Sequence, residues 1–166
     1  EFAEAEKAVQ ARIDHLMGIK GKKSVDSIHK ELGHIMWEYV GMGRTEEGLK
    51  TALKLLKDIR KEFETNLFIP GSTEGVNIEL EKALRLNDFI TMGELIAYDA
   101  LNRNESCGGH FREEYQTEEG EAKRDDENYF YVSCWEYQGS DDVAPVLYKE
   151  PLVYEAIKVQ TRNYKS

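Results

Sequence analysis

The stretch T-E-E-G-L-K-T-A-L-K-L-L-K-D-I-R-K-E-F, residues 45–63, decides the fold that the sequence predicts. Its apolar residues recur at intervals of three and four, which places them on one face of an α-helix. Thr45 can cap the first turn with its side-chain oxygen, and Glu46 and Glu47 suit the positive end of the helix dipole. An apolar helix face is stable only when another element covers it, so we expect several helices that pack together. The stripe consists of Leu49, Ala52, Leu53, Leu56, Ile59 and Phe63.

The same periodicity predicts three more helices in the first part of the chain. Ser24 is the expected N-cap of the second helix, and Gly41 to Gly43 should end it with a glycine in the left-handed conformation. In the last helix, Gly93 and Ala97 share one face and would let a neighbouring helix approach closely. The predicted ranges are residues 2–17, 25–40 and 76–103.

Beyond these helices glycine, charge and aromatic residues replace the helical period. The aromatic and β-branched residues 129–137 predict a strand. Residues 153–159 alternate in polarity, which fits either a second short strand or an extended arm. The predicted fold class is therefore mainly α, an antiparallel three-helix (spectrin-repeat-like) bundle followed by an extended tail with short β-strands. We expect one structural domain, with the bundle in residues 1–104 and a C-terminal tail, residues 105–166, packing on it.

Composition limits the possible partners. The chain has 166 residues, the size of one domain. Its 32 acidic and 22 basic residues give a net charge of -10, which disfavours nucleic acid and anionic membrane surfaces. No apolar run approaches the roughly 20 residues of a membrane-spanning helix, so no membrane insertion is expected. Two cysteines, Cys107 and Cys134, are too few for a disulfide framework and lack zinc-site spacing.

The segment E-S-C-G-G-H-F-R-E-E-Y, residues 105–115, places a thiol near an imidazole across a glycine turn. Cys107 and His110 could therefore act as nucleophile and base. Three neighbouring glutamates disfavour the thiolate, however, because negative charge raises the cost of ionising a thiol. A structural corner is the favoured interpretation.

Other candidate sites also have simpler structural interpretations. His29 and His34 are five residues apart, so their side chains diverge by about 140° around a helix, too far to share one metal easily. The acids beside Arg124 could hold a divalent cation, but an exposed run of charge is favoured. Trp135 and Tyr137 could stack on a nucleotide, but a core or interface role is favoured. From the residues alone, the sequence predicts no catalytic, cofactor-binding or metal site.

Several segments together carry a family resemblance. E-S-C-G-G-H-F-R-E-E at residues 105–114 and R-D-D-E-N-Y at residues 124–129 resemble the C-terminal region of the flavoprotein subunit of succinate dehydrogenase and fumarate reductase. That family carries approximately E-S-R-G-x-H-x-R-x-D and then R-D-D-x-x-W. Upstream, A-R-I-D-H-L, S-V-D-S-I-H-K-E-L-G and M-W-E-Y-V-G-M-G-R-T-E-E-G-L follow in the order of the family's helical domain. The resemblance covers nearly the whole chain.

The sequence departs from the family pattern at three places. Cys107 stands where arginine is usual, Tyr129 replaces tryptophan, and Y-Q-T-E-E-G-E-A-K, residues 115–123, lengthens the gap between the motifs. These departures indicate a particular branch of the family and put in doubt any role carried by that arginine's charge.

The resemblance implies a parent enzyme that interconverts succinate and fumarate through FAD and passes electrons to an iron-sulfur subunit. It implies that the FAD-binding domain and the catalytic residues lie upstream, so this chain is expected to be an inactive fragment that holds no cofactor. Its expected partners are the FAD-binding domain of the same chain and the iron-sulfur subunit, at the cytoplasmic, inner face of the cell membrane. Candidate interdomain docking residues are His110, Arg112, Arg124, Asp125 and Asp126.

Two other interpretations remain open at this stage. L-aspartate oxidase, a related flavoenzyme, shares the E-S-R-G-x-H part, although R-D-D-E-N favours the succinate and fumarate enzymes. The chain could also be a free-standing helical interaction module whose likeness to the family is only architectural.

Overall fold

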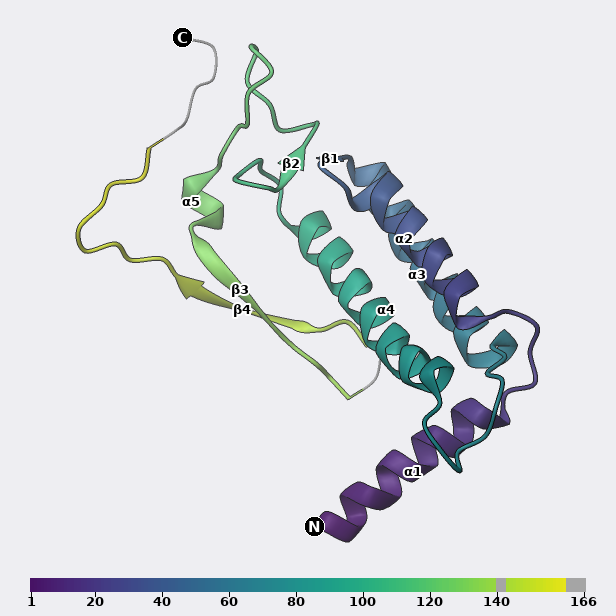
Figure 1. Cartoon of the computed structure of the whole chain (residues 1–166). Coiled ribbons are helices and arrows are strands. Elements are labelled where there is room, and N and C mark those ends of the chain that lie inside the picture. The colour runs from purple at the N-terminus through teal and green to yellow at the C-terminus, as the bar shows by residue number, and fades with distance from the viewer. Residues whose placement is uncertain (140–142, 161–166) are drawn as a thin grey trace.

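The computed structural model describes residues 1–139 and 143–160, and Figure 1 shows its arrangement. Three long helices lie side by side, each antiparallel to the next, and the rest of the chain extends along one side of them. The predicted mainly α class, with a three-helix bundle and a tail with short strands, is therefore confirmed. The elements are α1 Phe2–Gly18, α2 Val25–Val40, β1 Gly43–Arg44, α3 Glu46–Asn66, α4 Ile78–Asn102, β2 Phe111–Arg112, α5 Asp126–Tyr129, β3 Tyr131–Glu136 and β4 Val146–Pro151.

Side-chain caps begin the bundle helices. Ser24 Oγ accepts a hydrogen bond from Ser27 N, and Thr45 Oγ1 accepts one from Gly48 N at 3.0 Å, as the sequence predicts. The predicted left-handed glycine at the end of α2 is wrong, because Gly41 has a φ of -67°. Glycine is needed there for space, since a Cβ on Gly41 would lie 2.7 Å from the carbonyl oxygen of Trp37.

The hydrophobic core lies between α2, α3 and α4. Ile28, Leu56 and Ile90 contribute fully buried side chains from the three helices. The predicted close approach occurs at Gly93, where a Cβ would lie 3.2 Å from Met36 Sδ on α2. The small residues of α4 thus let the helices pack at short range, and this rigid stack supports the tail.

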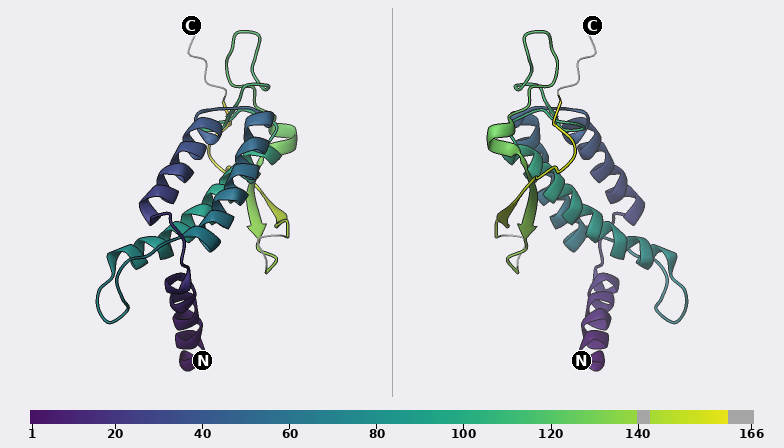
Figure 2. Two further views of the ribbon diagram at one scale, coloured as in Figure 1. Left: turned by 90° about the vertical axis from the view of Figure 1, so that its right-hand side faces the viewer. Right: turned by 90° about the vertical axis from the view of Figure 1, so that its left-hand side faces the viewer.

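Helix α1 lies outside this core. Figures 1 and 2 show it projecting from one end of the bundle. Its predicted apolar stripe finds little cover, because α1, all of which is described, buries only Leu16 and leaves Phe2 95% exposed. Arg12 Nη2 joins it to α4 by donating to the carbonyl of Leu84 at 3.2 Å and pairing with Asp88.

The tail forms one antiparallel hairpin. The predicted strand at residues 129–137 is confirmed as β3, which pairs with β4 from Tyr131 opposite Pro151 to Glu136 opposite Val146. The predicted strand at residues 153–159 is wrong, since β4 ends at Pro151 and residues 152–160 have no strand pairing. That segment is instead the alternative, an extended arm, because β3 is already paired over its length with residues 146–151.

A second, parallel pairing joins the bundle to the tail. β1, in the turn between α2 and α3, pairs with β2 so that Gly43 lies opposite Phe111 and Arg44 opposite Arg112. This contact brings together residues that are 68 positions apart in the sequence, and it positions the polar side chains of the corner. None of the helices within the described residues has the length and apolar character needed to cross a membrane.

Candidate functional site

The corner begins where the chain leaves α4. Cys107 and His110 exchange two backbone hydrogen bonds of 2.8 and 3.0 Å, which close a tight turn. Gly108 makes this turn possible with a φ of +59°, a conformation that residues with a Cβ rarely adopt. The favoured interpretation of residues 105–115 as a structural corner fits this geometry.

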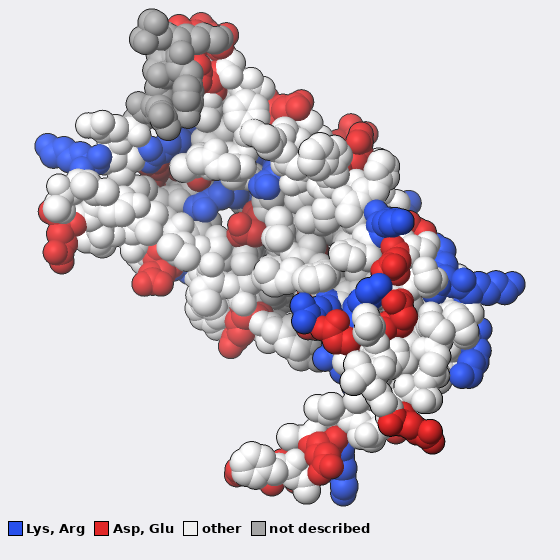
Figure 3. Space-filling view, in the orientation of Figure 1, with Lys and Arg blue, Asp and Glu red and all other residues white. Residues whose placement is uncertain are grey.

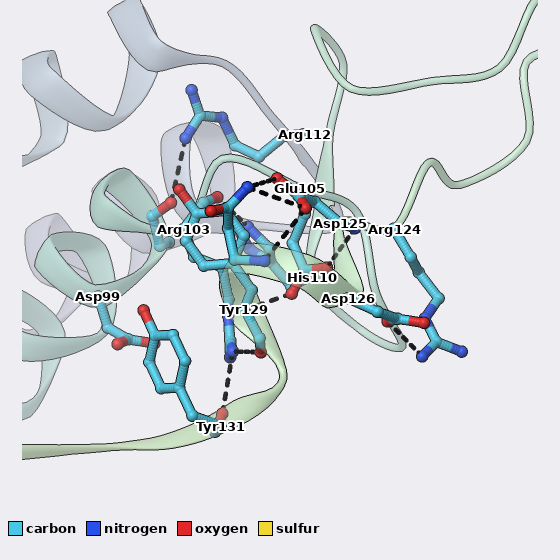
Figure 4. Close-up of polar contacts among 12 residues, drawn as sticks. Asp99, Arg103, Glu105, His110, Arg112, Arg124, Asp125, Asp126, Tyr129 and Tyr131 are labelled. Carbon is cyan, nitrogen blue, oxygen red and sulfur yellow. Dashed lines mark hydrogen bonds and ion pairs between the residues drawn. The ribbon is translucent and has the colours of Figure 1, made fainter. Parts of the chain in front are cut away.

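Arg112 is fully buried beneath this corner. Its Nη1 donates to the carbonyls of Ala100 and Leu101, at 3.1 and 3.4 Å, and its Nε donates to Glu114. These bonds satisfy carbonyls in the last turn of α4, which have no partner within the helix. Figure 4 shows the side chain directed to the end of α4. Arg112 therefore clamps the tail onto the bundle, although its buried Nη2 has no hydrogen-bond partner among the described residues.

His110 connects two other arginines. Arg44 Nη1 donates to Nδ1 of His110 at 2.8 Å, because a guanidinium can only donate. Nε2 must then carry the proton, which it donates to the carbonyl of Arg103 at 2.9 Å. Burial, together with the charges of Arg44, Arg112 and Arg103, lowers the pKa of His110 from its ordinary value of 6.5. The imidazole is thus held neutral in one tautomer.

This geometry removes the thiol-base hypothesis for Cys107. Both ring nitrogens of His110 already bond to arginine groups, so neither is available to accept a proton from the thiol. Cys107 itself is exposed. The two residues share a turn but do not form a catalytic pair.

Arg124, Asp125 and Asp126 lie together on the outer side of the corner, away from Arg112 (Figure 4). Arg124 Nε donates to Asp126 Oδ1 at 3.0 Å, and this partner raises the pKa of Arg124. Asp125 caps the short helix α5 by accepting from Asn128 N, while its own N–H donates to Glu105 Oε2 at 3.0 Å. The predicted docking residues therefore form two groups, one inside the corner and one on its surface.

The metal hypotheses find no support in the part of the chain that the structure covers. No group of three or more acidic, histidine or cysteine side chains is placed to hold an ion among these residues. His29 stacks on Phe89 with a centroid distance of 5.5 Å, and His34 is exposed. The two imidazoles therefore lie in different surroundings, which agrees with the divergence that their five-residue spacing predicts.

Sequence reasoning missed the residues that attach β3 to the bundle. Arg103 Nη2 donates to the carbonyls of Tyr129 and Tyr131, at 2.6 and 3.0 Å, and its guanidinium lies over both rings. Its Nε faces the buried carboxylate of Glu105 at 3.3 Å. The sequence does contain a signal for this contact: Arg103 follows the last helical turn, and Glu105, two residues later, can pair with it. Arg103 holds the tail where it passes the end of α4.

A comparison with known families matches residues 29–164 to the family described as "Fumarate reductase flavoprotein C-term". The chain belongs to this family. The C-terminal region of succinate dehydrogenase and fumarate reductase flavoproteins, named from the motifs above, is thereby confirmed as its family.

Individual relatives agree with the assignment to the fumarate reductase flavoprotein C-terminal family. A fumarate reductase flavoprotein subunit of Helicobacter pylori is 29% identical over 88% of this chain and 20% of its own length. A chloroplastic L-aspartate oxidase of Nicotiana tabacum is 37% identical over 53% of this chain and 13% of its own. A solved quinol-fumarate reductase with menaquinol molecules has a TM-score of 0.76 at 25% identity, covering 93% of this chain and 26% of that one. The chain spans about a fifth or less of the curated relatives' length.

The family is one of flavoproteins, but the described residues do not fit a flavin dinucleotide. Such a cofactor is typically held by a parallel sheet with a glycine-rich turn leading into a helix. Here the parallel pairing of β1 and β2 is two residues long, and the other sheet of the described residues is an antiparallel hairpin. The fumarate reductase flavoprotein C-terminal fold, as this chain presents it, is a helical bundle with an attached tail.

Proposed function

We propose that this domain braces the FAD-binding domain of a flavoprotein that interconverts succinate and fumarate. In this proposal residues 1–104 form the bundle and residues 105–166 the tail, as one structural domain of a longer chain. The tail docks on the FAD-binding domain, and the parent passes electrons to an iron-sulfur subunit at the cytoplasmic face of the membrane. Flavin and substrate chemistry belong to the rest of the parent.

One observation carries this proposal: the two faces of the corner have different roles. Arg103, Arg112 and His110 direct their hydrogen bonds inward, to carbonyls and side chains of the same chain. Arg124 and Asp126 form an ion pair on the outer side of the corner, where the Asp126 side chain is 52% exposed and the Arg124 side chain 19%. The inner group makes the corner rigid, and the outer group offers directional charged contacts to a neighbouring domain. We therefore assign docking to Arg124, Asp125 and Asp126, supported from within by His110 and Arg112.

The test uses the intact parent flavoprotein with Arg124→Ala, and Arg85→Ala as the control. Arg85 pairs with Glu81 on α4, away from the corner, and shows what the loss of an exposed ion pair does. Arg124→Ala should lower the melting temperature of the parent and speed proteolysis between its domains. The same change in the 166-residue chain should cost only about 0.5–1.5 kcal/mol in the free energy of unfolding, because it removes one ion pair and the bond to the carbonyl of Gln160. An Arg124→Ala parent as stable and active as the Arg85→Ala parent would contradict docking through this residue.

The 37% identity to an L-aspartate oxidase keeps a second candidate function for the parent. Both candidates give this domain the same bracing role, so the assay must be made on the parent. Oxidation of succinate without oxidation of L-aspartate would support the first candidate, and the reverse would support the second. Turnover or tight flavin binding by the 166-residue chain alone would contradict the bracing role itself.

A further inference from the structure

Arg44 differs from the other arginines of residues 1–139 and 143–160 because it forms no ion pair. It is half-buried, and burial lowers its pKa more than the nearby charge of Asp99, which forms no ion pair with it, raises it. A charged group removed from water without a counter-ion is unfavourable. The other arginines all have acidic partners: Arg12 with Asp88, Arg60 with Glu94, Arg85 with Glu81, Arg103 with Glu105, Arg112 with Glu114, and Arg124 with Asp126.

The protein groups that Arg44 contacts do not neutralise its charge. Its Nε is shared between the carbonyls of Val40 and Gly41, at 3.2 and 3.0 Å, and its Nη1 donates to neutral His110. No hydrogen bond occupies Nη2 within the described residues. The guanidinium is thus fixed in position by three bonds and retains donor capacity and a full positive charge.

Arg44 lines a recess of about 380 Å³ between α4 and β3. This volume is within the range of small-molecule sites. Figure 3 shows positively charged side chains in the hollow between the tail and the end of the bundle. Apolar walls and a few polar groups meet there, the usual composition of a ligand pocket. The lining residues used below are Arg44, Ile96, Asp99, Arg103, His110 and Trp135.

The other charged groups of the recess restrict what can bind. Arg103 is already engaged with two carbonyls and Glu105, which leaves Arg44 as the available cation. Asp99, which also lines the recess, accepts from Trp135 Nε1 at 2.8 Å, and its carboxylate attracts Arg44 without pairing with it. Asp99 would repel a second negative group on a ligand, so the recess favours one carboxylate attached to an uncharged body.

We propose that this recess binds a single carboxylate group on Arg44, with the ligand's uncharged body against Ile96 and Trp135. Two sources offer this chemistry, a free monocarboxylate and an aspartate or glutamate side chain of a polypeptide.

The test titrates the 166-residue chain with sodium propionate and, separately, with N-acetylglutamate α-amide, which presents a side-chain carboxylate between two peptide bonds. NMR signals of the Arg44 Nε–H and the Trp135 indole N–H report on the recess, and sodium chloride at equal ionic strength is the control. We expect saturable shifts with a midpoint of roughly millimolar concentration for at least one probe. Binding of the glutamate derivative about tenfold more tightly indicates a polypeptide ligand, and equal or tighter binding of propionate indicates a free one.

Two substitutions should change the affinity of the recess for a carboxylate in opposite directions. Arg44→Lys should weaken binding about tenfold, because lysine cannot hold a carboxylate with two parallel bonds. Asp99→Asn keeps an oxygen that accepts from Trp135 and removes the repelling charge, so binding should tighten several-fold. Arg85→Lys, on the exposed part of α4, should leave the midpoint unchanged.

The proposal would be overturned if the NMR shifts with both carboxylates stayed linear and matched those with sodium chloride. It would also be overturned if the Arg44→Gln variant showed the same saturation as the unaltered chain. The titration of the unaltered chain decides the matter even if a variant fails to fold.

Discussion

The indole of Trp135 on β3 donates a hydrogen bond to Asp99 Oδ1 on α4 across 2.8 Å. Tyr98, the residue before Asp99, packs edge-on against the same indole with a centroid distance of 5.1 Å. Together with Arg103 at the other end of β3, this contact holds the hairpin to the bundle. The hairpin is therefore attached by a few specific side chains in the last turns of α4 and just beyond its end.

Replacing Trp135 with phenylalanine should loosen the hairpin. The change keeps an aromatic ring but removes the bond to Asp99, and we expect a loss of about 1–2 kcal/mol in the free energy of unfolding. Urea denaturation followed by circular dichroism measures it. Trp37→Phe is the control, because Trp37 is 83% exposed. Equal stability of the two variants would show that the hydrogen bond contributes nothing.

Arg112→Met should destabilise the domain strongly. Methionine fills similar space but leaves the carbonyls of Ala100 and Leu101 without the buried donor that now serves them. We expect a loss of about 2–4 kcal/mol, measured by chemical denaturation of the 166-residue chain. Arg85→Met removes an exposed pair instead and should cost less than about 0.5 kcal/mol. A small effect of Arg112→Met would mean that the end of α4 does not depend on this clamp.

His110 should make stability depend on pH. Its pKa is lowered in the folded chain, so the unfolded chain binds the proton first as pH falls. The stability that neutral His110 contributes is fully present above the ordinary pKa of 6.5. It is lost as pH falls from 6.5 through the lower pKa of the folded chain. The free energy of unfolding, measured by denaturation, should be lower at pH 5.5 than at pH 7.5. In the His110→Gln variant this difference between the two pH values should be smaller. A ring of His110 that titrates at 6.5 or above by NMR would contradict the proposed tautomer.

Gly21→Ala should be severely destabilising, because the new Cβ would lie 1.9 Å from the backbone carbon of Asn66. The chain there cannot yield without breaking the bond from Gly21 N to Leu67 O. We expect a loss of about 2–3 kcal/mol or more in the free energy of unfolding. Gly18→Ala meets no atom within 4 Å and should be neutral or stabilising. If both changes behaved alike, the close approach of these two segments would not occur in solution.

The sequence alone determined the parts of this protein that depend on neighbouring residues. The period of Leu49 to Phe63 predicted α3, Ser24 and Thr45 predicted the caps, and two glycines before His110 predicted the turn. The family motifs at residues 105–114 and 124–129 also indicated a structural corner after the last bundle helix. All these signals are local, because helical period, capping and glycine conformation act within a few residues.

Only the tertiary structure decided which groups meet. Arg44 and His110 are 66 residues apart and are joined by the pairing of β1 with β2, which no periodicity indicated. Arg112, predicted to dock a neighbouring domain, lies buried against the end of α4, while the apolar stripe of α1 lies mostly in solvent. Sequence period states which face of a helix is apolar, but burial and charge pairing depend on the distances that folding creates.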